Sequence, residues 1–295
     1  MQQDERSGLV LAASGFALLS VGDAVVKTMA GEWSPIAVAA LRFAIGAFAL
    51  SVLLWRSEGA AGFRASNPLL QVARGACLAG ATICFFSAIF VMPLADTMAL
   101  TFLSPIFVAL LSGPLLGEEV RSEVWLVSAI ALTGVALILR PNLAVLGWQA
   151  LLPIGSAAFF ALMVIANRAT KGQGSALSMQ AFIALWATPF LIAAALAGSW
   201  TGAPSLALTM PDWTIAARCA LVALTATCAH WLAYLGTMRA GAATIAPTTY
   251  IQIVVASVLG YLVFGDIPDL LTLTGAAIVI AAGLILWRRT PATPK

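Results

Sequence analysis

Charged residues are scarce in this sequence: Asp, Glu, Lys and Arg together make up 9% of 295 residues. A soluble domain carries about 25% charged residues, and its surface needs them to stay in solution. The scarcity therefore excludes a water-soluble globular protein. The net charge of +3 is small and scattered along the chain, so nucleic acid is not an expected partner.

Histidine, cysteine and enzyme motifs are scarce as well. The chain has one histidine and four cysteines, and no cysteine has metal-ligand spacing with another cysteine or with histidine. We therefore expect no metal, cofactor or disulfide framework. The sequence contains no HExxH, GxSxG or Walker A pattern. These absences predict that the protein is not an enzyme and does not itself hydrolyse ATP.

What the sequence has in abundance is long apolar runs, with 61% hydrophobic residues overall. A helix needs about 20 apolar residues to cross a bilayer, and runs that are continuous rather than alternating favour helices over a β-barrel. The first run is too long for the core of a signal peptide. We predict an all-α integral membrane protein with ten transmembrane helices at residues 7–30, 34–55, 70–92, 94–116, 122–139, 147–168, 178–199, 213–238, 241–264 and 270–287.

The ten runs form two sets of five that resemble each other. The fifth run contains LTGVALILRP and the tenth contains LTGAAIVIAAGLILWRR. Other matches in the same order are Gly117-Glu118 with Gly265-Asp266, Arg74 with Arg218, and Lys27 with Arg168. Because five is an odd number, the second set is inverted in the membrane. We predict two inverted five-helix repeats, residues 1–141 and 142–295, that form one bundle.

The distribution of basic residues predicts the orientation. With ten spans, both termini share one side of the membrane with the loops after spans two, four, six and eight. That side holds most of the Lys and Arg residues, whereas the other side holds only Lys27 and Arg140, with Arg218 near it. Positive residues favour the cytoplasmic side. We therefore expect both termini in the cytoplasm and the protein in the plasma membrane, which for a bacterium is the inner membrane.

Several of these residues also follow the pattern of a known family. They are Ser20-Val-Gly-Asp-Ala-Val-Val-Lys27, Pro35 with Ala40-Leu-Arg42, Arg74, Leu103-Ser-Pro105-Ile-Phe, Gly117-Glu118, and Gly134 to Pro141. In this order the chain resembles the ten-helix EamA-type members of the drug/metabolite transporter superfamily. The resemblance implies a substrate path between the two halves and alternating exposure to the two sides. The first span departs from the family pattern, because it carries Asp23 and lacks the Trp-Gly often found before the family's lysine. This difference weakens any assignment of the substrate by analogy.

Three ionisable residues lie deep in the first two spans, where a charge is costly and marks a functional site. Asp23 and Lys27 are four residues apart on one helical face, and Arg42 lies near mid-depth of the second span. One interpretation is a local ion network that fixes the two spans. The other is a site for a zwitterionic or charged metabolite, in which Asp23 also loads and releases a proton.

Polar and aromatic residues in the middle of other spans complete the predicted substrate-binding set. His230 is the only histidine, and its side chain titrates in the range that suits proton coupling. Pro105 and Pro247 lie in corresponding spans of the two repeats, which predicts bends near the cavity. Ordinary packing is the alternative for each aromatic residue. The predicted cavity residues are Phe85, Ser87, Trp186, His230, Trp231, Tyr234, Tyr250 and Gln252, together with Asp23, Lys27 and Arg42.

Together these features predict a secondary transporter that exports a small metabolite, an amino acid or a similar molecule, by alternating access. Its expected partners are the small-molecule substrate, the lipid bilayer and protons as the coupling ion. The alternatives within transporters are an uptake or exchange carrier for a cofactor-like molecule such as S-adenosylmethionine, and a multidrug exporter. A channel, an intramembrane enzyme and a receptor are the alternatives from other classes.

Overall fold

The computed structural model describes residues 2–116, 122–170, 173–240 and 246–289, and it has no strand in these ranges. The helices are α1 (Gln2–Lys27), α2 (Pro35–Glu58), α3 (Pro68–Val91), α4 (Leu94–Thr101), α5 (Ser104–Leu116), α6 (Ser122–Leu146), α7 (Leu152–Ala169), α8 (Ala176–Trp200), α9 (Trp213–Ala240), α11 (Ile251–Leu259) and α12 (Leu270–Arg289). Short helical turns are η1 (Gly59–Phe63), η2 (Gly147–Leu151), η3 (Pro204–Leu206), η4 (Ala246–Tyr250) and η5 (Gly260–Phe264), the last of them π-helical.

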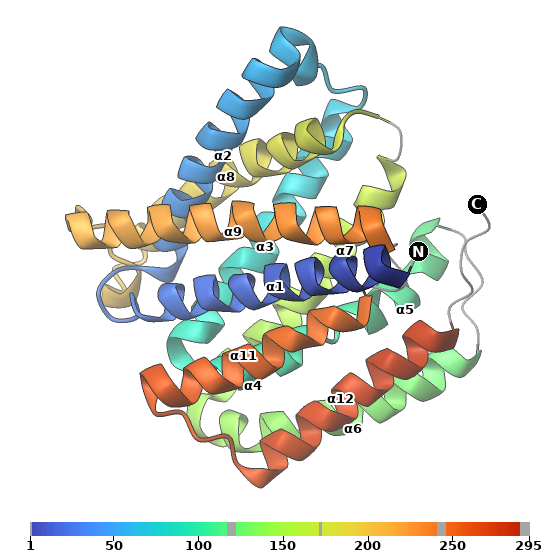
Figure 1. The fold of residues 1–295 in the computed structure, drawn as a ribbon. Coiled ribbons are helices and arrows are strands. Elements are labelled where there is room, and N and C mark those ends of the chain that lie inside the picture. Colours follow the sequence, from blue (N-terminus) through green and yellow to red (C-terminus); the bar gives the residue numbers. More distant parts are fainter. Residues whose placement is uncertain (1, 117–121, 171–172, 241–245, 290–295) are drawn as a thin grey trace.

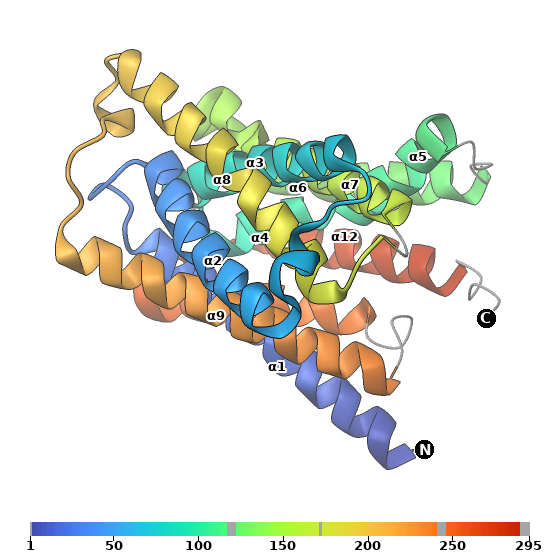
Figure 2. The same ribbon diagram turned by 90° about the horizontal axis from the view of Figure 1, so that it is seen from above.

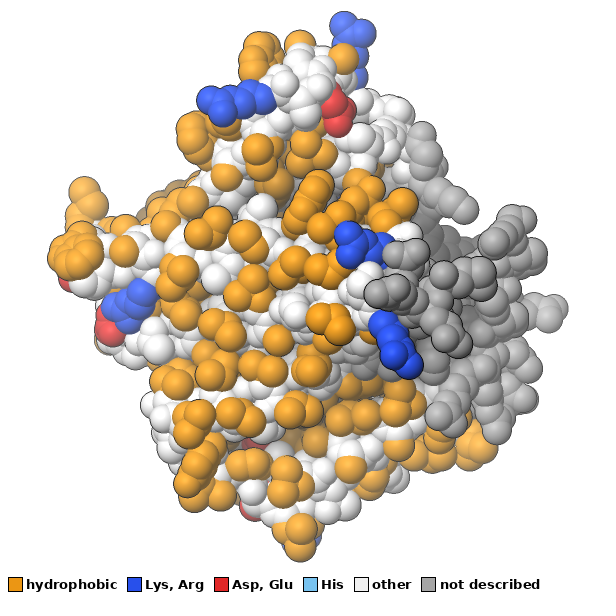
Figure 3. Space-filling view, viewed as in Figure 1, with side chains coloured by type: hydrophobic (Ala, Val, Ile, Leu, Met, Phe, Trp, Pro, Cys, Tyr) orange, Lys and Arg blue, Asp and Glu red, His pale blue; other side chains and the backbone are white. Residues whose placement is uncertain are grey.

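The helices have the length and composition of membrane spans. Within the described ranges, seven helical segments are long and apolar enough to cross a bilayer, and three shorter apolar segments cover Trp125–Arg140, Thr248–Phe264 and Leu270–Ala282. These segments follow the ten predicted runs in order. Figure 3 shows a face that is covered largely by hydrophobic side chains and interrupted by few charged ones. The prediction of an all-α, multi-span membrane protein is confirmed.

Local sequence explains where most helices begin and end. Pro35 and Pro68 occupy the first positions of α2 and α3, where a missing backbone N–H costs nothing. The Asn67 side chain accepts a hydrogen bond from the Leu70 amide at 3.2 Å and so caps α3. The fifth apolar segment ends at Arg140, close to the predicted end at residue 139, whereas the helix α6 continues through Pro141 to Leu146. It ends before Gly147, whose φ of +58° is rare for other residues.

The fourth predicted span is interrupted, and the corresponding span of the second predicted repeat changes helix type. Phe102 and Leu103 divide the predicted run 94–116 into α4 and α5. Pro105 is the second residue of α5. The corresponding run of the second repeat is described from residue 246 and begins with the short turn η4 before α11. An interrupted helix is a common feature of the substrate site of secondary transporters.

The helices pair in a pattern that is unchanged when the two sets of five are exchanged. α1 packs against α9, and the exchanged pair, α7 and α3, also packs together. α2 packs against α8 and α6 against α12, and each of these pairs is its own counterpart. Figures 1 and 2 show α1 beside α9, and Figure 1 shows α6 and α12 running antiparallel along one edge. Two inverted repeats would give this pattern, and the repeat boundaries stay a prediction.

Candidate substrate cavity

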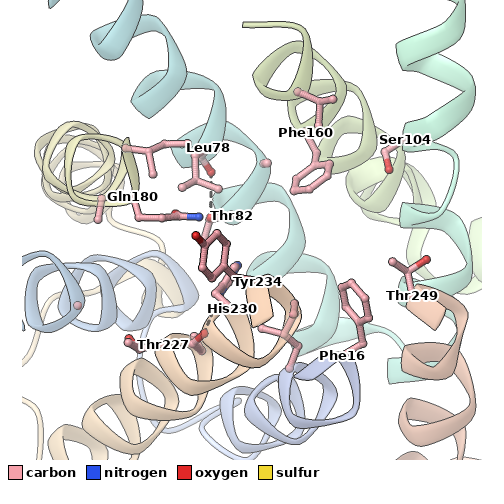
Figure 4. A pocket seen from close by; sticks show the side chains of 18 of the residues that line it. Phe16, Leu78, Thr82, Ser104, Phe160, Gln180, Thr227, His230, Tyr234 and Thr249 are labelled. Carbon is pink, nitrogen blue, oxygen red and sulfur yellow. Dashed lines mark hydrogen bonds between the residues drawn. The ribbon is translucent and has the colours of Figure 1, made fainter. Parts of the chain in front are cut away.

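A cavity of about 2090 Å³ lies between the helices of both sets of five. Most of its wall comes from α1, α2, α3, α4, α5, α7, α8, α9 and η4, and single residues of α6, α11 and α12 complete it. Figure 4 shows Phe16, Thr82, Gln180, Tyr234 and Thr249 around it. A pocket for a drug-sized ligand usually measures roughly 300–1,000 Å³, so this cavity has room for a larger substrate or for a small one with water.

The cavity occupies only one half of the thickness of the bundle. Its wall includes α1 only as far as Asp23, α3 only as far as Phe86, and α8 only as far as Ala184. On α2 and α9, which run the other way through this region, it begins at Arg42 and Ala223. The cavity reaches the exposed residues Ser57 and Glu58 at the end of α2. It therefore reaches the side on which α1 begins and not the opposite side.

On the opposite side Lys27 closes the bundle. Its ammonium group lies 2.5 Å from a carboxylate oxygen of Asp266 and donates to the Met92 carbonyl oxygen at 3.1 Å. It also lies 4.7 Å from the centre of the Phe264 ring. The side chains of the Lys27–Asp266 pair are 12% and 25% exposed. This one pair joins α1, the end of α3 and the loop after η5, so it ties the two sets of helices together.

A second ion pair lies on the same side, farther from the cavity. Arg218 of α9 donates from both terminal nitrogens to the Glu32 carboxylate, and from one of them to the Thr28 carbonyl oxygen at 3.1 Å. The hydrogen bond from Arg218 lowers the pKa of Glu32, and the arginine charge acts in the same direction. Glu32 follows the end of α1, outside the helices. The pair therefore fastens α9 to the end of α1.

Asp23 and Arg42 both face the cavity but form no ion pair with each other. Both line it, and they are close enough for electrostatic attraction, yet they form no ion pair. Within the described part of the chain no hydrogen bond engages either charged group. The guanidinium carbon of Arg42 instead lies 4.9 Å from the Phe43 ring centre and 5.5 Å from that of Phe86. An acid and a base with free bonding capacity can hold the two charges of a zwitterion.

Polar and aromatic side chains make up the rest of the wall. Nδ1 of His230 lies 2.6 Å from the Ala226 carbonyl oxygen; because a carbonyl only accepts, Nδ1 carries the proton and Nε2 is left for a ligand or water. The rings of Trp231 and Tyr234 lie 5.9 Å apart, and those of Phe102 and Tyr250 lie 5.1 Å apart. Such rings can stack on an apolar or planar part of a ligand.

The structure brings together eight of the eleven residues predicted from the sequence. The eight that line the cavity are Asp23, Arg42, Phe85, His230, Trp231, Tyr234, Tyr250 and Gln252. The other three, Lys27, Ser87 and Trp186, lie outside its wall. Lys27 shares a helical face with Asp23 but turns to Asp266, and no ion network joins Asp23, Lys27 and Arg42 among the described residues. The Trp186 backbone and Cβ instead pack against Gly75 of α3.

Other cavity residues were not predicted. Arg74 was noted as a repeated basic residue and as part of the family pattern but not as a cavity residue, yet it lines the cavity and is 5% exposed. Gln180 lies close to the start of α8, where a polar residue is ordinary, so nothing in the sequence distinguished it. Phe16, Thr82 and Thr227 also line the cavity, and their residue types are common in membrane helices. The Gly117-Glu118 pair, predicted to match Gly265-Asp266, lies outside the described residues.

Comparison with known proteins places this arrangement in a family. The pattern of the EamA-like transporter family matches residues 6–140. The pseudopaline exporter CntI of Pseudomonas aeruginosa strain UCBPP-PA14 is 30% identical over 284 residues, which cover 96% of each chain. The chain belongs to the EamA-like transporter family. The resemblance to the drug/metabolite transporter superfamily is thereby confirmed, and this EamA-like transporter is an integral membrane protein.

Other relatives are named for different substrates. A riboflavin transporter of Rhizobium johnstonii is 26% identical to this EamA-like transporter over 95% of this chain and 89% of the relative. An S-adenosylmethionine uptake transporter of Rickettsia prowazekii is 23% identical over 90% of this chain and 87% of the relative. One protein crystal structure has a TM-score of 0.62 at 19% identity and covers 97% of this chain and 99% of its own. That structure shows a shared fold.

Proposed function

We propose that this EamA-like transporter exports a small zwitterionic metabolite, an amino acid or a similar molecule, across the plasma membrane. The observation that carries the proposal is that an acid, Asp23, and a base, Arg42, both line the cavity and form no ion pair with each other. The substrate carboxylate would bind Arg42 and its ammonium group would bind Asp23. Export is the direction of the 30% identical relative, and other relatives are named for uptake.

The proposed mechanism is alternating access by two inverted repeats, residues 1–141 and 142–295. The described conformation has its cavity on the side on which α1 begins, and the positive-inside pattern supports a cytoplasmic location for that side. Breaking the Lys27–Asp266 pair would let the halves rock and open the opposite side. Both termini would then be cytoplasmic, and in a bacterium the membrane would be the inner one.

Proton coupling is proposed for Asp23. A carboxylate that pairs with the substrate ammonium group in one state can take a proton in the other, so that the proton and the substrate move in opposite directions. His230 lines the same cavity with Nε2 available and would relay the proton to water.

A second candidate function is supported by the size of the cavity. At about 2090 Å³ it exceeds what one amino acid occupies, and the aromatic pairs Trp231–Tyr234 and Phe102–Tyr250 suit a planar ring. These observations favour a carrier for a cofactor-like molecule. Relatives named for riboflavin and S-adenosylmethionine support the same candidate.

Flux in proteoliposomes tests the proposal. Wild type, Asp23→Asn and Arg42→Gln are compared in a screen of amino acids, riboflavin and S-adenosylmethionine, with and without a pH gradient. We expect saturable flux that falls at least about tenfold in both variants, with the pH dependence lost in Asp23→Asn. Arg56→Gln, an exposed residue at the end of α2, is the matched control. Wild-type flux and unchanged pH dependence in Asp23→Asn would remove Asp23 from the mechanism.

A further inference from the structure

Arg74 is a buried cation on the cavity wall that has no acidic partner among the described residues. The residue is 5% exposed. Its Nε donates to the Asn167 side-chain oxygen at 2.5 Å, and Nη1 donates to the Gln71 side-chain oxygen and, at 3.5 Å, to the Met179 sulfur. All three acceptors are neutral. A guanidinium inside a membrane protein is costly when its charge is not balanced.

The second terminal nitrogen of Arg74 is the group left for a ligand. None of the hydrogen bonds that Arg74 makes to described residues uses Nη2. This nitrogen is also not among the fully buried polar atoms that lack a partner, and Arg74 is one of the residues that line the cavity. Two carboxylates among the described residues line the cavity, those of Asp23 and Glu58, and neither forms an ion pair with Arg74. Glu58 instead accepts a hydrogen bond from Ser175 at 2.6 Å.

Comparison with Arg218 shows that the missing acid is specific to Arg74. The two arginines occupy matching positions at the starts of spans three and eight. Arg218 binds Glu32, which lies five residues after Lys27. Five residues after Arg168, the match of Lys27, the sequence has the neutral Gln173. Arg218 is thus paired with an acid of the protein, whereas Arg74 is held in place by amides and lines the cavity.

Arg74 also lies far from the Asp23–Arg42 pair. Arg42 lies against Phe86, and Phe86 and Arg74 are twelve residues apart on α3. At 1.5 Å per residue this corresponds to about 18 Å along the helix. The cavity wall is continuous between them, since Leu78 and Thr82 also line it. A small amino acid cannot reach both places.

We infer that Arg74 forms a second subsite, which binds a carboxylate at the far end of an elongated substrate whose zwitterionic end lies at Asp23 and Arg42. This inference rests on the proposed function and makes it more specific: the substrate has three charged groups, two at one end and an anion at the other. The apolar and aromatic wall between the subsites would contact the uncharged middle of the molecule.

Binding to the purified full-length protein in detergent tests this inference by calorimetry. The probes are L-glutamine and a series of N5-(ω-carboxyalkyl)-L-glutamines, which separate one carboxylate from a zwitterionic end by a methylene chain of increasing length. Each member of the carboxyalkyl series has a control compound in which the remote carboxylate is replaced by a neutral amide. We expect the carboxylate form of the longest probes to bind wild type at least about tenfold more tightly than the amide form.

The variants separate the second subsite from the first. Arg74→Gln should bring the ratio of carboxylate to amide affinity to about one and leave L-glutamine binding unchanged, whereas Arg74→Lys should keep part of the ratio. An undiminished ratio in Arg74→Gln, or no ratio in wild type while L-glutamine still binds, overturns the second subsite alone. Absence of binding for every probe contradicts the zwitterion site as well. Competition by phosphatidylglycerol through Arg74 would assign the subsite to lipid and also overturn the inference.

Discussion

Gly134 of α6 and Gly275 of α12 pack backbone to backbone. A Cβ atom at Gly134 would lie 2.7 Å from the carbonyl oxygen of Gly275, and one at Gly275 would lie 2.5 Å from the carbonyl oxygen of Gly134. The two glycines also occupy the same place in the repeated Leu-Thr-Gly sequence. The contact is therefore reciprocal between residues that correspond in the two predicted repeats, as expected at a two-fold axis. Small residues allow such close helix approach in membranes.

Substitution of either glycine should separate α6 from α12. Gly134→Ala and Gly275→Ala are each expected to lower the free energy of unfolding by about 1–3 kcal/mol, because a backbone oxygen cannot turn away from the new methyl group as a side chain could. Thermal unfolding in detergent measures the effect. Gly46→Ala in α2 is the control, since a Cβ there meets nothing within 4 Å, and it should be neutral or stabilising. Equal stability of all three variants would contradict the close contact.

The Lys27–Asp266 pair should control the opening of the closed side. Lys27→Gln leaves the Asp266 carboxylate without its partner and removes the bond to the Met92 carbonyl, so the closed state loses stability. We expect slower flux in Lys27→Gln and in Asp266→Asn. The double exchange Lys27→Asp with Asp266→Lys should recover part of the rate. If the exchanged variant is no better than the single ones, attraction between the two charges is not what closes this side.

The Glu32–Arg218 pair predicts a stability change in acid. The pKa of Glu32 is lowered by its hydrogen bond from Arg218, so the pair stabilises the fold above the ordinary glutamate pKa of about 4.3. That contribution is lost as the pH falls through the lowered value. The side chains of Arg218 and Glu32 are 25% and 46% exposed, and the effect of the pair is expected to be at most about 1 kcal/mol. Thermal unfolding of wild type and Glu32→Gln should therefore differ at pH 7 and converge in strong acid. A constant difference across this pH range would refute the assignment.

The sequence predicted the helices well because bilayer thickness determines their length. It also identified Asp23, Arg42 and His230, since a polar side chain in a long apolar run is conspicuous. It failed where a partner is distant in the chain: Lys27 was grouped with Asp23 by helical spacing, but its counter-ion lies 239 positions away at Asp266. Helical periodicity gives the face of a residue and not the helix that covers it.

Trp186 shows a second limit of the sequence. A tryptophan in the middle of a span indicates either a cavity or a contact with a small residue, and the sequence does not distinguish them. Here the contact residue is Gly75 on α3, where an added Cβ would collide with the Trp186 backbone. The burial of Arg74 was also not predicted from the sequence. Its position near a predicted helix end is ordinary for arginine, and only the packing of Asn167 and Gln71 around it reveals its burial.

The accessibility of Cys228 tests the central claim, a cavity that opens to one side of the membrane at a time. Cys228 lines the cavity and is exposed to it, so it is a native reporter once Cys77, Cys84 and Cys219 are replaced by alanine. A membrane-impermeant thiol reagent is applied to inside-out and right-side-out vesicles, with and without Lys27→Gln. We predict labelling from the cytoplasmic side only with Lys27 present, and labelling from both sides in Lys27→Gln. Equal labelling from both sides with Lys27 present would contradict the account.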